Sequence, residues 1–479
     1  MNAEENKRNK VLLKGTIIYA IGNFGTKILS FLIVPLYTFY ISPADLGAYD
    51  ILVSTVSLLS PMITLRISEA TYRWMIQGLD NDINCLSATY NLLFRNCAIT
   101  FLLIAVTNYF IPIWNWQYFA SILVLDRILE CLQKVLRGVK NQKLYAFSGV
   151  FYTALFVFLN LYLICYIKMG VVALLQSTVI SQLATILLIV ICEKRLRTYK
   201  PLKNYKSLRK KMIKYSAPLV PSALSWWVMG ASDRYIIRFF LGSTANGIYA
   251  VACKFPSILT TIFVMFNNAW TDLALAELRA GNSTKEYTKK IFREMYMIAF
   301  GLTLVLIPAT KVITQFILGN AYVTASVYIG FLYLGSVFQG FSAFCSIGYL
   351  QDDKTNGAAI SSLYGALVNV AIDLLLIKYI GLFAAAISTF VGFFVMWIVR
   401  VRHVREKFPV EINKREFYFY LIVLLLLATF SIWSTIWIDI VLTVIASICF
   451  ILTNRKYLKH ILLRYIHKNG ANNYDKKSN

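Results

Sequence analysis

A long stretch of this chain occurs twice, and the repetition limits how the chain can fold. Residues 15–59 and 215–259 share one layout: an apolar run long enough to cross a bilayer, a short turn, and a second apolar run. Residues recur at a constant spacing, so that Phe39, Gly47 and Tyr49 return as Phe239, Gly247 and Tyr249. Both copies carry ionised side chains inside their apolar runs. Two related halves with charges inside the membrane are typical of transporters.

The composition indicates a polytopic α-helical membrane protein. Of the 479 residues, 58% are hydrophobic and 15% are charged, whereas soluble domains average about 25% charged residues. Apolar runs of membrane-spanning length follow one another along the chain, which predicts an all-α protein with about fourteen transmembrane helices. The first run is long enough to remain in the membrane, so no cleavable signal peptide is expected.

The longest polar stretch separates two pseudo-symmetric six-helix lobes, and a helix pair follows them. The expected parts are a cytosolic N-terminus at 1–14, an N-terminal lobe at 15–192, a basic cytosolic linker at 193–214, a C-terminal lobe at 215–402, a cytosolic loop at 403–416, helices at 417–453 and a cytosolic tail at 454–479. In the repeat, the expected helices cover 15–40 and 44–75 in the first copy, and 215–240 and 244–275 in the second.

Lys and Arg in the loops predict the orientation. Alternate loops hold most of the 48 Lys and Arg residues, whereas the opposite loops hold only a few, among them Lys168, Lys311 and Lys378. The positive-inside rule then places both termini in the cytoplasm. This asymmetry accounts for most of the net charge of +25 without any nucleic acid, and anionic membrane lipids are sufficient partners for the basic loops.

The sequence has no pattern typical of an enzyme or a metal site. The eight cysteines occur singly and the three histidines lack metal-ligand spacing, so we expect neither a metal nor a cofactor. The outer loops are short, without an acidic catalytic motif, and there is no nucleotide-binding glycine loop. A transporter driven by an ion gradient, or by the gradient of its own substrate, is therefore expected in place of an enzyme.

Charged residues inside the apolar runs are the candidate site. An ionised Lys or Arg at mid-bilayer costs about 2.5–3.5 kcal/mol, so it must pair, reach the interface or line a wet cavity. Two sets can pair locally because their members share one helical face. They are Arg66 with Glu69 and Arg73, and Arg127 with Glu130 and Lys134.

Three cations lack such a neighbour. Lys27, Arg234 and Lys254 have no acid three or four residues away. Asp233 adjoins Arg234, but it points about 100° around the helix. These cations need an anion from another helix or from a substrate, and the sequence leaves both alternatives open.

Two acids and two aromatic residues complete the candidate set. Asp233 and Asp373 lie deep in apolar runs, where a buried carboxylate can carry a proton and so couple transport to a gradient. Pairing with a membrane cation is the alternative. Trp226 and Trp227 lie inside a predicted helix and can either stack on a sugar ring or pack in the core.

The two copies of the repeat resemble a known family. The segments GNFGTKILSFLIVPLYTFYISPADLGAYD and PLVPSALSWWVMGASDRYIIRFFLGSTANGIYAVACKFPSIL are similar to the signature regions of bacterial polysaccharide-export flippases of the O-antigen type. That family belongs to the multidrug/oligosaccharidyl-lipid/polysaccharide exporter superfamily. The resemblance extends over roughly residues 10–402, and its most specific elements are the Asp-Arg-Tyr motif and the spacing Gly-x-x-x-x-Gly-x-Tyr.

The resemblance implies two six-helix lobes that form a V and work by alternating access in the bacterial cytoplasmic (inner) membrane. The implied cargo is an undecaprenyl-diphosphate-linked oligosaccharide for O-antigen, lipopolysaccharide or capsule, which would be handled together with a glycan polymerase and glycosyltransferases. Lys27, Arg66, Arg234 and Lys254 match positions that would line the cavity. A lipid II flippase and a multidrug cation exporter of the same superfamily remain alternatives, as does a membrane enzyme of glycan assembly.

Overall fold

The computed structural model describes residues 29, 31–197, 205–279, 285–350, 355–405, 408, 410 and 412–474. Helices are the regular secondary structure of this part of the chain, which contains no strand. The predicted all-α fold is therefore confirmed. The described residues form two compact units: unit 1 ends at Lys254 and includes Gly319–Tyr322, and unit 2 consists of Phe255–Leu318 and the chain from Val323 onward. The lobe boundaries inferred from the sequence remain a prediction.

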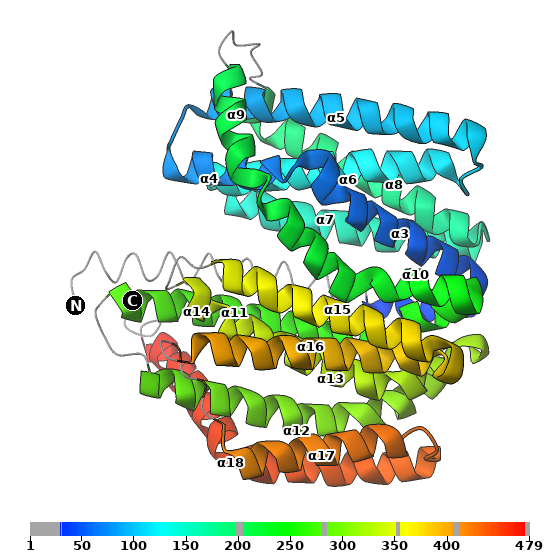
Figure 1. The fold of residues 1–479 in the computed structure, drawn as a ribbon, viewed down its shortest axis with the longest axis vertical. Helices are drawn as coiled ribbons and strands as arrows, with labels where there is room; N and C mark the ends of the chain where they lie inside the picture. Colours follow the sequence, from blue (N-terminus) through cyan, green and yellow to red (C-terminus); the bar gives the residue numbers. More distant parts are fainter. Residues whose placement is uncertain are drawn as a thin grey trace. The chain divides into compact units, whose positions relative to one another are not determined.

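Unit 1 contains the helices from the blue end of the described chain up to the green helix α10 (Figure 1). They are α2 (Val34–Tyr40), α3 (Pro43–Thr64), α4 (Ile67–Gln77), α5 (Asp82–Phe110), α6 (Trp116–Gly138), α7 (Gln142–Asn160), the π-helix η1 (Leu161–Tyr166), α8 (Val171–Cys192), the short 3₁₀-helix η2 (Lys194–Arg197), α9 (Tyr205–Ser216) and α10 (Leu219–Ala252). Residues 215–254, which begin the second copy of the repeat, thus pack in the same unit as the first copy.

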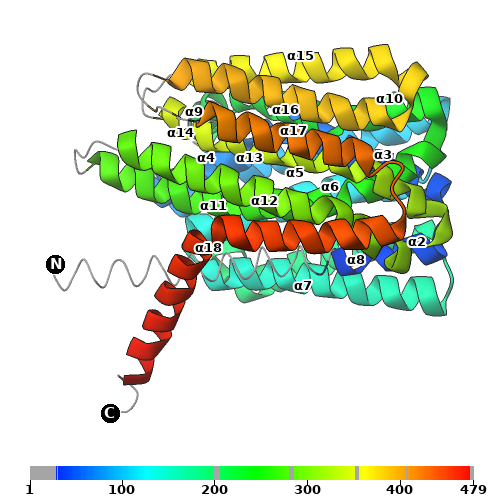
Figure 2. The same cartoon turned by 90° about the horizontal axis from the view of Figure 1, so that it is seen from below.

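Unit 2 contains the remaining helices, and α11 starts at the boundary between the units. They are α11 (Lys254–Arg279), α12 (Lys285–Ile317), the 3₁₀-helix η3 (Asn320–Tyr328), α13 (Ile329–Cys345), α14 (Ile347–Leu350), α15 (Thr355–Ile380), α16 (Leu382–Val404), α17 (Lys414–Phe430) and α18 (Ile436–Tyr474). Within this unit, α17 and α18 both pack against α12 (Figure 2).

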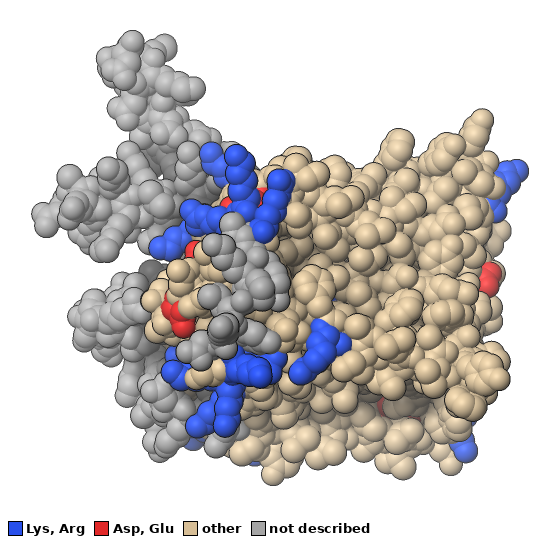
Figure 3. Space-filling model, turned by 90° about the horizontal axis from the view of Figure 1, so that it is seen from above, with Lys and Arg blue, Asp and Glu red and all other residues tan. Residues whose placement is uncertain are grey.

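The described helices are those of a multi-pass membrane protein. Nine are long and apolar enough to cross a membrane, and the number is ten if the bent pair 219–252 and 254–268 forms one span. In the face shown in Figure 3, uncharged residues cover a broad middle band, and most Lys and Arg residues gather towards one end. Large apolar side chains are exposed on these helices, as expected where lipid replaces water.

The turn between the two expected helices of the repeat is present in both copies, although residues 15–28 of the first expected helix lie outside the described residues. The single helix expected at 244–275 is wrong, because α10 ends at Ala252 and α11 begins at Lys254 with a bend of 41° between them. In the first copy, α2 ends at Tyr40, and α3 begins after Ser42, whose hydroxyl accepts a hydrogen bond from the Asp45 amide at 3.2 Å. In the second copy, α10 is interrupted at Gly242, whose φ of 86° and ψ of 177° are not helical. Only glycine adopts that backbone conformation readily, so residues 219–241 and 243–252 are two helices joined by this glycine.

The single helix expected at 44–75 is wrong, because the chain breaks between α3 and α4. Leu65 and Arg66 both have left-handed backbone angles, with φ of 48° and 55°, at a cost of roughly 1–2 kcal/mol each. Side chains satisfy the broken ends: Asn96 Nδ2 donates to the Ile63 carbonyl at 2.7 Å, and the Arg66 amide donates to Thr64 Oγ1 at 3.2 Å. No glycine marks the break, and the hydropathy of the sequence does not reveal it either.

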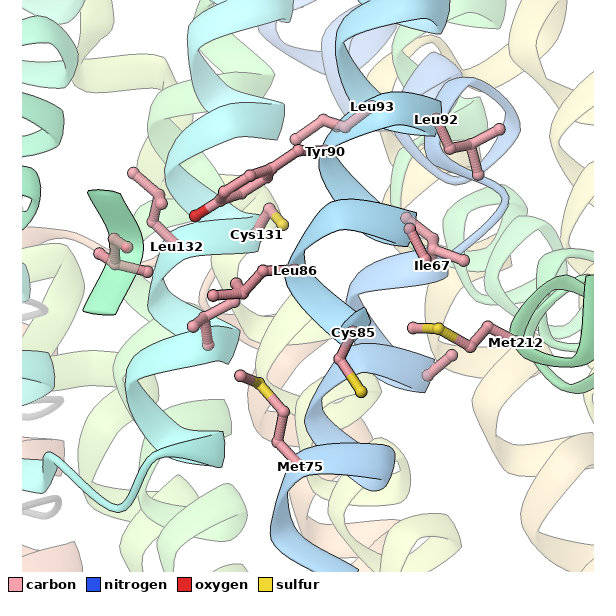
Figure 4. Close-up of a cluster of buried hydrophobic side chains, with 14 of the residues drawn as sticks. Ile67, Met75, Cys85, Leu86, Tyr90, Leu92, Leu93, Cys131, Leu132 and Met212 are labelled. Carbon is pink, nitrogen blue, oxygen red and sulfur yellow. The ribbon is translucent and has the colours of Figure 1, made fainter. Parts of the chain in front are cut away.

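The two units have different cores. In unit 1, a cluster of mainly aliphatic and sulfur-containing side chains joins α4, α5 and α6, and Met212 of α9 also enters it (Figure 4). In unit 2, aromatic rings fill the centre, and Trp397 of α16 stacks on Phe417 of α17 with centroids 5.3 Å apart. Close packing is what holds helices together in lipid, since lipid tails are as apolar as the side chains. The rings therefore attach α17 firmly to unit 2.

Candidate functional site

The structure describes all of the predicted site residues except Lys27, which lies outside the described residues. The other predicted site residues of unit 1 are Arg66, Trp226, Trp227, Asp233, Arg234 and Lys254, and Asp373 belongs to unit 2. Lys254 is exposed at the start of α11, next to the bend between α10 and α11. The remaining residues lie in two regions of unit 1 and one region of unit 2.

The first region lies where α3 packs along α10. Glycines at equivalent positions of the repeat face each other there: a side chain at Gly47 would collide with the Ser243 carbonyl, and one at Gly247 would collide with the Pro43 carbonyl. The two copies of the repeat therefore meet backbone to backbone. This close approach brings the Asp50 carboxylate of α3 up to the Arg234 guanidinium of α10.

Arg234 is paired across these helices. Its Nε lies 2.9 Å from Asp50 Oδ2, and each side chain is only 16% exposed. Arg234 also donates to the Gly230 carbonyl at 2.7 Å, while Asn246 Nδ2 donates to the Gly47 carbonyl at 2.9 Å. Of the two alternatives for this cation, the structure shows an anion from another helix.

Asp233, the neighbour of Arg234, points into the protein. It is 2% exposed, and it accepts a hydrogen bond at 3.0 Å from the hydroxyl of Tyr249, which is itself buried. Tyr249 lies beyond Gly242, so this bond joins the two helical parts of α10. The Asp-Arg-Tyr motif and the Gly-x-x-x-x-Gly-x-Tyr spacing are therefore in direct contact.

The indole N–H of Trp227 is hydrogen-bonded within unit 1. Its Nε1 donates to the Ser54 carbonyl and to Ser57 Oγ, both at 3.0 Å. The ring packs edge-on against Tyr235 with centroids 5.5 Å apart, and Tyr235 shares a 2.6 Å hydrogen bond with Thr55. These contacts fix α10 on α3. Part of the Trp227 ring is exposed, as is part of Trp226, so sugar contact by either residue stays a prediction.

The second region combines α4 with α6, and one of its carboxylates contacts two cations. Glu69 Oε1 lies 3.0 Å from the Arg66 guanidinium and 2.7 Å from Lys134 Nζ. One carboxylate thus serves two cations. The side chains of Arg66, Glu69 and Lys134 are 31%, 22% and 22% exposed, so both cations are partly accessible.

The local pairing expected on each helix is correct only in part. Arg66 pairs with Glu69, and Arg127 contacts Glu130 as expected, together with Asp126 and Ser60. Lys134 was expected to join Glu130, but it pairs with Glu69 because α4 and α6 lie side by side.

Arg73 was expected to share the acid of Arg66. It instead bonds Gln77 and lies over the Tyr215 ring, 4.4 Å from the centroid.

The third region is the interior of unit 2. Asp373 of α15 is fully buried, and one turn away Asn369 Nδ2 donates to Ser388 Oγ of α16 at 3.2 Å. The close approach of α15 to α16 requires Gly392, where a side chain would meet Asn369. The buried Asp373 carboxylate thus lies one turn along α15 from an amide–hydroxyl contact that joins these two helices.

Two buried cations of unit 2 were not recognised as such in the sequence. The loop charges predict an outer loop at Lys311, but Lys311 lies in α12 and is 7% exposed, beside a fully buried Asp439 at 3.4 Å. Arg400, at the end of α16, is 1% exposed and donates to Ser361 Oγ, the Ser342 carbonyl and Ser362 Oγ at 3.0, 2.7 and 3.0 Å. Serines are too common to reveal such a site from sequence spacing.

The fold is similar to those of solved membrane proteins. The structure is similar to the lipid II flippase MurJ in an inward closed conformation, with a TM-score of 0.67, 13% identity, and coverage of 92% of this chain and all of that one. It is also similar to an inward-facing multidrug resistance MATE family transporter of the MOP superfamily, with a TM-score of 0.62, 14% identity, and coverage of 80% and 98%. Identities this low establish the fold alone.

The family follows from the sequence match. The chain belongs to the polysaccharide biosynthesis protein family, whose model matches residues 12–271. This range includes both copies of the repeat and every candidate residue of unit 1. An uncharacterized membrane protein of Methanocaldococcus jannaschii, MJ1068, is 27% identical over 186 residues. That match covers 36% of this chain and 35% of the relative's length.

Proposed function

We propose that this protein is a flippase that moves undecaprenyl-diphosphate-linked oligosaccharide units across the bacterial cytoplasmic membrane by alternating access. The family and the transporter fold support this proposal. The observation that carries it is a pair of partly exposed cations in unit 1, Arg66 and Lys134, which share the single carboxylate of Glu69. A diphosphate is an anion that such a pair of cations can bind.

The cations have different parts in this proposal. Arg66 and Lys134 would contact the diphosphate, because each has hydrogen-bond donors beyond those that Glu69 occupies. Arg234, Lys27 and Lys254 would complete the cationic path. The exposed part of Trp226 or Trp227 would contact the sugar. No chemical bond in the cargo changes, so the activity is transport and not catalysis.

The orientation and partners also belong to this proposal. Both termini would lie in the cytoplasm, as the loop charges predict. The glycosyltransferases that build the unit would act before this protein, and a glycan polymerase would act after it. Anionic lipids would surround the basic loops.

Removing the two cations of the α4–α6 region is expected to stop translocation. Each charge-assisted hydrogen bond is worth about 1.5–3 kcal/mol, so Arg66→Ala and Lys134→Ala should each weaken cargo binding roughly tenfold to a hundredfold. The measurement is transfer of a labelled undecaprenyl-diphosphate oligosaccharide across proteoliposomes that contain the purified protein. Lys143→Ala removes an exposed cation elsewhere in unit 1 and serves as the control. Normal transfer by the double variant would contradict the proposal.

The same assay identifies the cargo. Transfer of lipid II at an equal or higher rate would favour the lipid II alternative, and transfer of a lipophilic cation would favour a drug exporter. Release of a cleaved or extended glycan would indicate an enzyme. Faster transfer of the oligosaccharide lipid than of these competitors is the expected outcome.

We also propose that Asp373 couples transport to an ion gradient, with Asp233 as a further candidate. Asp373 is a fully buried carboxylate one helical turn from the Asn369–Ser388 contact, and a buried carboxylate can bind a proton or a sodium ion. Asp373→Asn should therefore abolish the stimulation of transfer by an imposed sodium or proton gradient, while basal exchange persists. Glu294→Gln changes a carboxylate elsewhere in unit 2 and should leave the stimulation intact. Full stimulation of the Asp373→Asn variant would refute this role.

A further inference from the structure

Helix α9 has two opposite faces of different chemistry. Leu208, Met212 and Ser216 are 8%, 0% and 0% exposed. Lys206, Lys210 and Lys214 are exposed and follow the same spacing. Residues four apart share one face of a helix, so α9 presents a buried face and, opposite to it, a row of lysines. The segment Tyr205–Ser216 contains no acid that could neutralise this row.

The buried face is fixed to unit 1. Met212 enters the core cluster formed by α4, α5 and α6 (Figure 4). Arg209 donates to Asn91 Oδ1 of α5 at 2.7 Å, and the Tyr215 ring packs against Trp74 of α4 with centroids 5.7 Å apart. The apolar side of α9 is therefore occupied by protein, and the lysine row is held in one orientation.

The direction of α9 differs from that of the spanning helices. Within unit 1, α9 crosses α5 at a steep angle near one end, and it does not run alongside it (Figure 1). Lys and Arg gather at one end of the face shown in Figure 3. A helix that crosses the end of a membrane bundle lies along the bilayer surface, where its exposed side chains reach the depth of the lipid headgroups.

We infer that the lysine row of α9 binds the headgroups of anionic phospholipids. The inference rests on the proposed function for the leaflet, which would be the cytoplasmic one, and it narrows the proposed contact of the basic loops with anionic lipids to this one row. An interfacial helix usually inserts its apolar face into lipid, but α9 uses that face against unit 1. The lysine row therefore recognises the negative charge of the headgroups, and each lysine should strengthen binding to anionic lipid roughly fivefold. Salt should weaken it, because the lysines are exposed.

The experiment compares thermal unfolding in nanodiscs of phosphatidylcholine with unfolding in an equal mixture of phosphatidylcholine and phosphatidylglycerol. No cargo is present, so the outcome is independent of the flippase assay. The test variant replaces Lys206, Lys210 and Lys214 with Gln. The control variant replaces Lys140, Lys143 and Lys194, three other exposed lysines of unit 1, with Gln and so removes the same charge.

The native protein is expected to unfold at a higher temperature in the anionic mixture, and high salt should abolish the difference. The test variant should lose more than half of this difference and keep the native midpoint in phosphatidylcholine, whereas the control should keep both. Three outcomes would overturn the inference: a full difference in the test variant, an equal loss in the control, or an equal drop of the test variant in both lipids. A full difference in the test variant would leave an acidic protein as the partner of the lysine row. An equal drop of the test variant in both lipids would indicate that these lysines have a structural role.

Discussion

Asp50→Ala is expected to destabilise unit 1 strongly, because it leaves the Arg234 charge in a mostly buried site without its carboxylate. Removing one partner of a buried ion pair costs about 3–5 kcal/mol, well above the typical effect of a point substitution. Both side chains keep 16% exposure, which places the expected loss near the lower end of that range. Arg234→Ala should cost a similar amount, since Asp50 is then left buried.

The double variant separates the pair from its surroundings. Removing both charges leaves neither side chain uncompensated, so Asp50→Ala with Arg234→Ala should recover most of the stability lost by either single variant. The four proteins are compared by their thermal unfolding midpoints in one lipid. Losses that simply add in the double variant would show that the two residues are not coupled.

The same double variant tests the cargo role of Arg234. If Arg234 serves only to hold α10 on α3, the stable double variant should transfer the oligosaccharide lipid at the native rate. If Arg234 also contacts the diphosphate, the double variant should be folded but transfer roughly tenfold or more slowly, the effect of one lost charge-assisted hydrogen bond. We expect the second result.

Lys311→Met is expected to release the α17–α18 helix pair from unit 2. The Lys311 ammonium donates to the Ser431 carbonyl, and to the carbonyl and hydroxyl oxygens of Ser434 at 2.7 and 2.9 Å, and it lies 3.4 Å from Asp439. It thus neutralises a fully buried carboxylate and satisfies carbonyls at the end of α17. Its loss should cost about 3–5 kcal/mol, as for other broken buried pairs.

The release can be measured without cargo. Limited proteolysis between α17 and α18 should become much faster in Lys311→Met than in the native protein, and the thermal midpoint should fall. Arg402→Met, which removes an exposed cation of the same unit, should change neither. If Asp439→Leu in the Lys311→Met background failed to restore any stability, the buried carboxylate would not be the source of the loss.

Local chemistry in the sequence was sufficient for the spanning helices as a class and for the turn in each copy of the repeat. Continuous apolar runs indicate spanning helices because the bilayer sets their length. The turn at Gly242 was predictable because the repeat aligns it with the turn before Pro43, and because glycine tolerates the backbone angles that the structure has there. Pairs three residues apart, such as Arg66 with Glu69, were also predictable, since both residues share one face of one helix.

Only the tertiary structure decided which charges meet across helices. Asp50 and Arg234 are far apart in the chain, and they pair because Gly47 and Gly247 let two backbones touch. Lys134 pairs with Glu69 and not with Glu130, which is closer to it in the sequence, because α4 lies beside α6. Hydropathy and helical spacing describe one helix at a time. The partner of a membrane charge depends on which helices pack together, a choice that no single segment contains.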